Sequence, residues 1–330
     1  MSVRIVVVGY GSAFGMGHHH AEQIRVTRGL ELVGICEPDA ERRKLAAETE
    51  AVPTYKSMDE VVADDGVDMV ALIVPHDVHA PLAIQAMEAG KHVITEKPMC
   101  VTTAEADGMI AASKANKVVL TVYHNRRWDS DFVTVKRLID EGAVGEVFMV
   151  EGAICGSRPL SGWRRLEKHG GGQLRDWGAH VLDQMCLIAG GPAKSVFAQF
   201  EHRVWTEIMD VPTHSQLMIQ FESGMWAEAT FSNISWAPKP RWRVLGEKGG
   251  LLKQTGGGGT VSLYHQVAGQ PSVTEVQCIE TKLAELYQNV ADHINEGVEL
   301  IVKPEQARRY VAIYEAAYVS AQTGQAVAPK

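Results

Sequence analysis

The first 123 residues alternate between two hydrophobic periodicities. Short runs of β-branched and aliphatic residues predict strands, and the longer segments between them have the spacing of helices. The strand-like runs are residues 4–8, 30–36, 69–74, 92–95 and 118–122, and the helical segments include 39–50, 79–89 and 103–116. Strands that recur about every 20 to 30 residues with helices between them are typical of β-α-β units, so we predict a parallel sheet covered on both faces.

The pattern of hydrophobic and polar residues changes after residue 123. Helical spacing alternates there with shorter, strand-like alternation of polar and apolar residues. The helical segments are 131–141, 170–189, 281–295 and 304–321, and the strands include 215–221, 225–232 and 241–245. The connections at 222–224 and 247–250 contain the glycines of hairpin turns, which predicts an antiparallel sheet. We therefore predict an α/β protein with two domains, residues 1–123 and an α+β domain of residues 124–330.

Composition narrows the class of protein without identifying it. The 330 residues are 45% hydrophobic and 22% charged, and a formal net charge of -8 is spread along the chain. We expect no nucleic-acid or membrane partner, because there is no basic block and no apolar run near the roughly 20 residues of a membrane span. The five cysteines are widely spaced and form no C-x-x-C pair, which favours a reducing, cytoplasmic location.

The stretch VVVGYGSAFGMGHHH, residues 6–20, follows the first predicted strand. Gly9 and Gly11 allow the backbone to approach a pyrophosphate, which a Cβ atom would obstruct. The third glycine of a G-x-G-x-x-G fingerprint would fall at Phe14. We therefore expect a longer loop, in which Gly17 packs the following helix and His20 begins it. The inserted residues are expected to cover the cofactor: Ser12, Ala13 and Phe14.

Three adjacent histidines in this stretch suggest a metal site at first sight. We expect His18 and His19 to lie in the enlarged loop and His20 in the helix. If all three were helical, their side chains would point about 100° apart and could not readily converge on one ion. No fourth ligand is obvious nearby, so we predict no metal.

Glu37 follows the second predicted strand, 20 residues after Gly17. An acid at that position accepts hydrogen bonds from the adenine ribose and repels a 2′-phosphate, which favours NAD over NADP. Arg42 and Arg43 lie one turn into the next predicted helix and could tolerate a phosphate, so NADP stays open. A solvated loop acid is the simpler alternative for Glu37.

The next two strand ends carry a second group of candidate cofactor-binding residues. Pro75, His76 and His79 follow one strand, and Glu96 and Lys97 follow the next. The carboxyl ends of parallel strands open onto the same ligand crevice. A lysine there can donate to a substrate hydroxyl and stabilise an alkoxide, although Lys97 alone reads equally well as a surface lysine. The end of the fifth strand adds further candidates for the pocket: His124 and Arg127 to bind the substrate and Asn125 to bind the cofactor.

The stretch KHGGGQLRDWGAHVLDQM, residues 168–185, combines a glycine-rich entry with helical spacing. That spacing puts Asp176, His180 and Asp183 on one helix face. An imidazole with a carboxylate one turn away is suited to proton transfer near neutral pH. Two acids and a histidine could also bind a metal, or the histidine could be satisfied in a core, and spacing alone leaves these alternatives open.

Together these motifs resemble the Gfo/Idh/MocA family of oxidoreductases, typified by glucose–fructose oxidoreductase and inositol dehydrogenases, over nearly the whole chain. The resemblance rests on Gly9-Tyr10-Gly11 with a later Gly17-x-x-His20, P-x-x-x-H from Pro75 to His79, Glu96-Lys97-Pro98, and GGG-x-x-x-D-x-G-x-H-x-x-D from Gly170 to Asp183. Residues 125–147 look more loosely like the branch that contains scyllo-inositol dehydrogenases. The lengthened glycine loop departs from the pattern and puts the phosphate contacts in doubt.

The resemblance implies an N-terminal Rossmann domain and a C-terminal domain with an open, mostly antiparallel sheet that forms a homodimer or homotetramer interface. It implies that Lys97, Asp176 and His180 are the catalytic set, and that Lys97-Pro98 is a cis peptide. It also implies two residues close to the cofactor or substrate: Trp163 and Arg164.

The activity we expect is reversible hydride transfer between NAD or NADP and a secondary alcohol of a cyclic polyol or sugar. One alternative is a redox-neutral sugar lyase or glycosidase that holds NAD tightly. The other is a nucleotide-binding regulator without chemistry, against which the intact set of Lys97, Asp176 and His180 argues.

Overall fold

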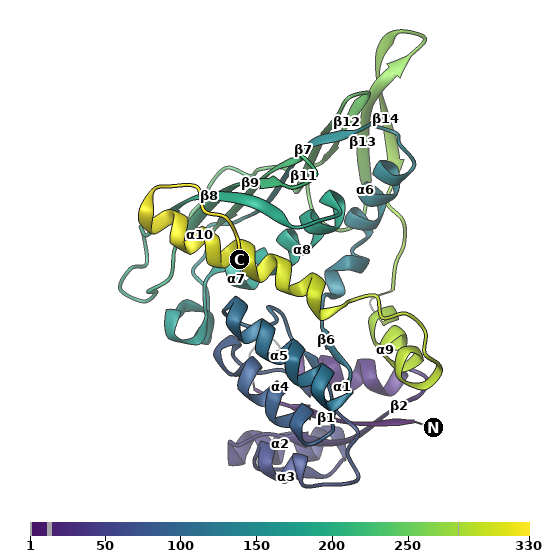
Figure 1. Cartoon of the computed structure of the whole chain (residues 1–330), viewed down its shortest axis with the longest axis vertical. Coiled ribbons are helices and arrows are strands. Elements are labelled where there is room, and N and C mark those ends of the chain that lie inside the picture. Colours follow the sequence, from purple (N-terminus) through teal and green to yellow (C-terminus); the bar gives the residue numbers. More distant parts are fainter. Residues whose placement is uncertain (1, 12–14, 283) are drawn as a thin grey trace. The chain divides into compact units, whose positions relative to one another are not determined.

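The computed structural model describes residues 2–11, 15–282 and 284–330, and the chain forms two compact units (Figure 1). The first unit contains Met1–His124 and Ala284–Arg308, and the second contains Asn125–Leu283 and Arg309–Lys330. The predicted division at residue 123 lies close to this one, but residues 284–308 belong with the first unit rather than the second. Their helix α9 (Glu285–Glu296) is strongly amphipathic, and its apolar side chains are buried in the first unit.

The first unit is built on a six-stranded parallel sheet in the order β3-β2-β1-β4-β5-β6. Its strands are β1 (Val3–Val8), β2 (Leu30–Cys36), β3 (Thr54–Tyr55), β4 (Met69–Leu72), β5 (His92–Thr95) and β6 (Leu120–Val122). Their apolar side chains are almost completely buried, as continuous rather than alternating hydrophobic runs predict. This strand order is that of a dinucleotide-binding Rossmann sheet, and the order reverses beside β1.

Helices connect these strands, as the sequence predicts. They are α1 (Met16–Val26), α2 (Ala40–Glu50), α3 (Met58–Val62), the 3₁₀ helix η1 (His76–Val78), α4 (His79–Glu88) and α5 (Thr103–Asn116). Side chains cap the first turns of several helices. The Asp39 carboxylate accepts a hydrogen bond from the Arg42 backbone N–H at the start of α2, and Thr102 and Glu105 form a capping box at the start of α5. These caps fix where α2 and α5 begin, and so where the loops before them lie.

The second unit is built on an eight-stranded sheet in the order β14-β13-β12-β11-β7-β10-β9-β8. The strands are β7 (Val147–Cys155), β8 (Ala193–Glu201), β9 (His214–Phe221), β10 (Trp226–Ser232), β11 (Trp242–Gly246), β12 (Gly249–Lys253), β13 (Thr260–Val267) and β14 (Gln270–Gln277). Only the pairing of β7 with β10 is parallel within this sheet. The predicted antiparallel sheet and the two predicted hairpin turns are confirmed.

Helices cover one face of this sheet (Figure 1). They include α6 (Ser130–Asp140), α7 (Gln173–Asp176), α8 (Gly178–Ala189) and α10 (Pro304–Thr323), with 3₁₀ turns η2 (Asn125–Trp128), η3 (Gly162–Arg165) and η4 (Glu167–His169). The part of α10 in this unit packs on β8, where the rings of Phe200 and Tyr318 lie 5.0 Å apart. Alternate residues of the strands point away from these helices and stay exposed.

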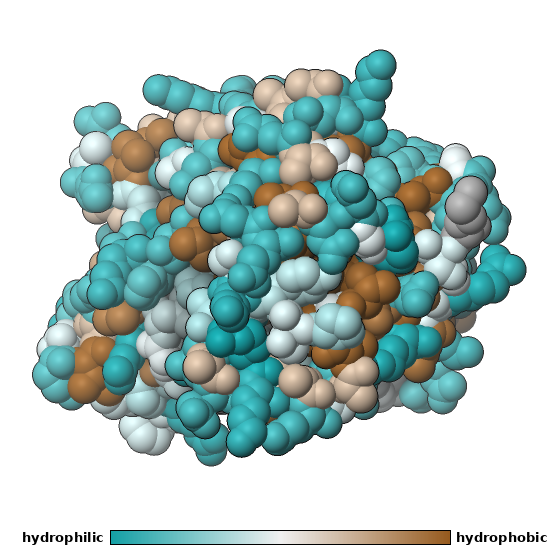
Figure 2. All heavy atoms as spheres, turned by 90° about the horizontal axis from the view of Figure 1, so that it is seen from below, coloured by the Kyte–Doolittle hydropathy of each residue, from teal (hydrophilic) through white to brown (hydrophobic). Residues whose placement is uncertain are grey.

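On the face shown in Figure 2, hydrophobic residues form groups among hydrophilic ones. Scattered groups of this kind are normal for a protein in water. Among the residues that the structure describes, no helix has the length and apolar character to cross a membrane.

Candidate active site

The glycine loop leaves β1 at a backbone position that only glycine fits. Gly9 has φ +96°, and an added Cβ would lie 2.2 Å from the carbonyl oxygen of Ile73. Gly17 lies in α1, where an added Cβ would come within 3.0 Å of the Gly9 carbonyl oxygen and 2.9 Å of the Tyr10 ring. Loop and helix therefore touch almost backbone to backbone, as the first and third glycines of a dinucleotide fingerprint require. Gly17 holds the helix-packing position that the sequence predicts for it.

Helix α1 begins earlier than the sequence predicts. It starts at Met16, after Gly15 in the left-handed conformation at φ 62°, so His20 lies in the second turn and does not begin the helix. The expectation that His18 and His19 lie in the loop is wrong for the same reason. A glycine at the N-cap adopts this conformation without strain, so the helix can start as soon as the loop ends. The candidate residues Ser12, Ala13 and Phe14 lie outside the described residues.

The three histidines of α1 point to different partners. His18 Nδ1 lies 2.7 Å from a carboxylate oxygen of Glu50, and His19 Nε2 lies 3.2 Å from the Tyr123 hydroxyl. His20 is buried and contacts a third set of groups, described below. Their divergence follows from the helical backbone, since adjacent residues point about 100° apart.

Glu37 lies against the glycine loop. Its carboxylate accepts hydrogen bonds from the backbone N–H groups of Tyr10 at 2.9 Å and Asp39 at 3.1 Å, and only 4% of the residue is exposed. The Arg43 guanidinium donates to the carbonyl oxygens of Glu37 and Pro38. Glu37 is therefore a fixed acceptor at the end of β2, which is the place where a Rossmann fold holds the adenine ribose.

These residues fit a dinucleotide. The loop offers backbone free of Cβ atoms at Gly9 and Gly17, and the N-cap residue of α1 is Gly15, which has no side chain to cap the helix. A helix start of this kind is suited to a pyrophosphate, and Glu37 to the ribose hydroxyls. Arg42 lies close to Gly11, with its guanidinium 3.7 Å from the position of an added Cβ there. This arrangement puts a cation beside the same loop.

His79 joins the loops that follow β4 and β5. Its Nδ1 lies 2.8 Å from the Pro98 carbonyl oxygen and its Nε2 lies 3.0 Å from that of Val74. The ring is fully buried, and this burial lowers its pKa. Pro75 lies in the loop after β4 and directly precedes η1. The buried ring of His76 lies 5.6 Å from that of His79. The geometry makes His79 a bridge between two strand ends.

Lys97 follows β5 and is half-buried. Its backbone N–H donates to Glu96 Oε2 at 2.9 Å, and the predicted cis peptide between Lys97 and Pro98 is confirmed. Burial acts to raise the pKa of Glu96, but the hydrogen bond with His20 and the positive charge of Lys97 outweigh it and lower that pKa. A carboxylate charge therefore lies next to Lys97. His124, another candidate, is buried just beyond the end of β6.

In the second unit, the three glycines at 170–172 pack onto the 3₁₀ turn η3. An added Cβ at Gly171 would lie 2.3 Å from the Arg164 carbonyl oxygen, and the Gly172 N–H donates to that oxygen at 2.8 Å. This close packing brings the Arg164 guanidinium to Asp176, with Nε 3.3 Å from the carboxylate, and the same guanidinium stacks on the Trp163 ring. The predicted residues Trp163, Arg164 and Asp176 thus form one cluster.

His180 and Asp183 lie on α8, as the helical spacing predicts. Asp176 does not share that helix, because it ends the separate short helix α7 before Trp177. His180 is only 4% exposed, and its ring lies 6.0 Å from that of Trp177. The Asp183 carboxylate forms two hydrogen bonds of 2.7 Å with the Arg127 guanidinium, and both residues are buried. Arg127, predicted to bind substrate, is therefore held by Asp183, and the predicted cofactor residue Asn125 opens the 3₁₀ turn that carries it. Sequence reasoning missed this pairing across 56 positions, because no local spacing signals it.

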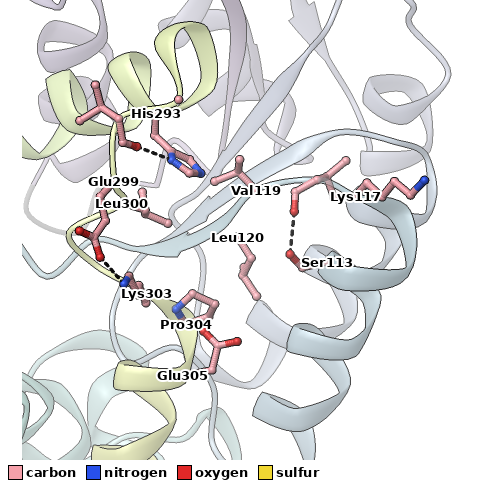
Figure 3. Close-up of a pocket in the computed structure, with 13 residues that line it drawn as sticks. Ser113, Lys117, Val119, Leu120, His293, Glu299, Leu300, Lys303, Pro304 and Glu305 are labelled. Carbon is pink, nitrogen blue, oxygen red and sulfur yellow. Dashed lines mark hydrogen bonds and ion pairs between the residues drawn. The ribbon is translucent and has the colours of Figure 1, made fainter.

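A surface pocket in the first unit is lined by other residues than the candidates named above (Figure 3). It is lined by the end of α5, the start of β6 and residues 297–305, with Ser113, Leu120 and Glu305 among them. Leu120 is at the amino end of its strand, whereas ligands of parallel α/β sheets bind beyond the carboxyl ends. We therefore do not assign the dinucleotide or the substrate to this pocket.

Comparison with known proteins gives the same assignment for both halves of the chain. Residues 3–124 match the model of an oxidoreductase family with an NAD-binding Rossmann fold, and residues 132–252 match a GFO/IDH/MocA C-terminal domain. The crystal structure of an NAD-binding protein from Listeria innocua is 32% identical, covers 99% of this chain and 97% of that one, and superposes with a TM-score of 0.87.

Two curated relatives are informative. The oxidoreductase YdgJ of Escherichia coli (strain K12) is 37% identical over 193 residues, which are 58% of this chain and 55% of that protein. The scyllo-inositol 2-dehydrogenase (NADP(+)) IolW of Bacillus subtilis (strain 168) is 27% identical over 290 residues, 80% of each protein.

Proposed function

Because the chain belongs to the Gfo/Idh/MocA family of oxidoreductases, we propose that it oxidises a secondary alcohol of a cyclic polyol or sugar reversibly with NAD or NADP. The observation that carries the proposal is the placement of Lys97 beside the Glu96 carboxylate at the carboxyl end of β5. That is the sheet edge at which the glycine loop and Glu37 fit a dinucleotide.

The proposed reaction uses two side chains, Lys97 and His180. His180 accepts the proton of the substrate hydroxyl, and Lys97 donates a hydrogen bond to the same oxygen as negative charge develops on it. The bound nicotinamide supplies the hydride acceptor. We assign Asp176, whose carboxylate is held by the Arg164 guanidinium, the role of orienting His180. Gly9, Gly17 and Glu37 hold the dinucleotide.

We propose an inositol-like polyol as the substrate. The support is the similarity to IolW, whose name gives scyllo-inositol as its substrate, together with the looser resemblance of residues 125–147 to that branch. A panel of inositol isomers and hexoses tests the proposal, with NAD or NADP as the oxidant and the absorbance of the reduced nicotinamide as the readout. Substrate consumed without reduced nicotinamide would instead identify the redox-neutral lyase or glycosidase.

Replacement of the two proposed catalytic groups tests their roles. Lys97→Ala and His180→Ala should each lose most turnover while they still bind the dinucleotide, as titration of the tryptophan fluorescence would show. Lys114→Ala is the matched control, because its exposed ion pair with Glu305 contributes little to stability. Turnover close to that of the unchanged protein in either Lys97→Ala or His180→Ala would overturn the assignment.

We also propose that the chain forms a homodimer or homotetramer through the open face of the eight-stranded sheet. Support comes from two aromatic side chains on this sheet, Phe197 and Trp226, each 40% exposed. Strand register places Trp226 opposite Met149, and Phe197 opposite Met218, so apolar groups neighbour both rings. Light scattering should show an oligomer that Trp226→Glu dissociates, and a monomeric unchanged protein would contradict the proposal.

A further inference from the structure

A chain of buried polar groups connects the C-terminal part of the first unit to the loop that carries Lys97. The Tyr287 hydroxyl lies 2.7 Å from His20 Nδ1, and His20 Nε2 lies 3.1 Å from Glu96 Oε1. The other oxygen of Glu96 accepts the backbone N–H of Lys97 at 2.9 Å. His20 is 1% exposed and Tyr287 is completely buried. Three elements, α9, α1 and the end of β5, thus meet through hydrogen bonds.

The charge of Glu96 sets the direction of its bond with His20. Burial, together with nearby negative charge, raises the pKa of Tyr287 well above its usual value, so its hydroxyl keeps the proton. Glu96 stays ionised, because its pKa is lowered despite burial. The Nε2–H of His20 therefore donates to the carboxylate, and its Nδ1 lies within hydrogen-bond distance of the Tyr287 hydroxyl.

We propose that His20 and Tyr287 are positioning residues that fix Glu96 and, through it, the backbone and charge environment of Lys97. The proposal rests on the proposed function, in which Lys97 donates to the substrate hydroxyl. A carboxylate with each oxygen bonded to a different partner has one orientation, so the Lys97 backbone has a fixed acceptor. Support of this kind sets how accurately a reacting group is placed.

Packing alone does not explain these residues. Buried polar groups are costly unless they are hydrogen-bonded, and an apolar pair would fill the space between α9 and α1 without that cost. Tyr287 lies 267 positions after His20, so the chain returns to the first unit to supply this hydroxyl. The ring of Tyr123 lies 4.3 Å from that of His20 and restricts the imidazole further.

The test compares two substitutions that each remove one buried hydroxyl. Tyr287→Phe removes the hydrogen bond to His20, and Thr121→Val removes the one from Thr121 to the Val302 carbonyl oxygen at 2.8 Å. Both bonds join residues 284–308 to the rest of the first unit, so thermal unfolding should show similar losses of stability. We expect kcat to fall in Tyr287→Phe with little change in the KM for the alcohol or in dinucleotide affinity, while Thr121→Val keeps its kcat within about twofold.

His20 itself provides a stronger perturbation and a rescue. His20→Leu should lower kcat by about 100-fold, the loss expected when a reacting group is displaced by roughly 1 Å. His20→Gln retains an amide donor for Glu96 and should recover part of that loss. If His20 acts through Lys97, His20→Leu removes no further activity from Lys97→Ala. An additive loss would overturn the proposal.

A readout without turnover comes from the lysine itself. Reductive methylation with ¹³C-formaldehyde gives each lysine an NMR signal, and the Lys97 signal is the one missing from Lys97→Ala. It should shift in Tyr287→Phe and stay in place in Thr121→Val. If Lys97→Ala is inactive but both hydroxyl variants behave alike in kcat and NMR, this inference fails and the proposed function stands. If Lys97→Ala keeps its turnover, the proposed function fails.

Discussion

Replacement of Arg127 by methionine should destabilise the second unit by about 3 to 5 kcal/mol, the usual cost of removing one partner from a buried ion pair. The two hydrogen bonds of 2.7 Å to Asp183 are well formed, and the side chains are only 6% and 2% exposed. Methionine fills much of the space of the arginine stem, so most of the loss comes from the carboxylate left buried without its partner.

The double variant Arg127→Met with Asp183→Leu should lose much less stability than the sum of the two single losses, since neither charge of this buried pair remains. Urea unfolding followed by circular dichroism measures each free energy of unfolding. A loss below about 1 kcal/mol for Arg127→Met would refute the reasoning, because exposed ion pairs contribute no more than that.

Activity in the same variants separates the two roles of Arg127. Asp183 lies one turn after His180 on α8, so loss of the pair should disturb the position of the imidazole and lower kcat. A structural Arg127 predicts that the double variant regains part of that kcat. A substrate-binding Arg127, as the sequence suggests, predicts a raised KM that the second substitution does not correct.

Three further substitutions test the first unit. Gly9→Ala should abolish dinucleotide binding in a fluorescence titration, because the new Cβ would lie 2.2 Å from the Ile73 carbonyl oxygen; tight binding would contradict this. Glu37→Gln should raise the ratio of kcat/KM for NADP to that for NAD, because it removes the charge that repels a 2′-phosphate but keeps an acceptor for Tyr10. Because burial holds the pKa of His79 below its ordinary 6.5, the unfolded chain binds a proton first and stability falls as pH drops below 6.5. His79→Gln should flatten that fall by up to about 1.4 kcal/mol per pH unit in urea titrations from pH 7 to 5, and an unchanged slope would contradict the assignment.

Hydrophobic periodicity predicted most of the first unit well, because buried parallel strands leave continuous apolar runs that end in loops. The start of α1 was predicted four residues too late, since the left-handed conformation of Gly15 depends on the loop around it. Residues 284–308 were assigned to the second unit instead of the first for a different reason. An amphipathic helix shows that it has a buried face, but not which core receives that face.

Burial and pairing separate the candidate residues into those that hold the structure and those that can meet the substrate. Motif spacing brought out His20, Glu96 and Asp183 together with Lys97, but it could not tell which of them meet substrate. Buried charged or polar groups are tolerated when they are paired, and His20 with Glu96, like Asp183 with Arg127, is paired within its own unit.

Such pairs hold a segment in place, whereas the half-buried Lys97 keeps part of its surface accessible. Each unit would then place its own reacting group through a buried polar contact from a remote part of the chain. If that is correct, Tyr287→Phe should affect turnover through Lys97, and Arg127→Met should affect it through His180. The fold losses in kcat of the two variants should therefore multiply when the substitutions are combined, because they act on different groups.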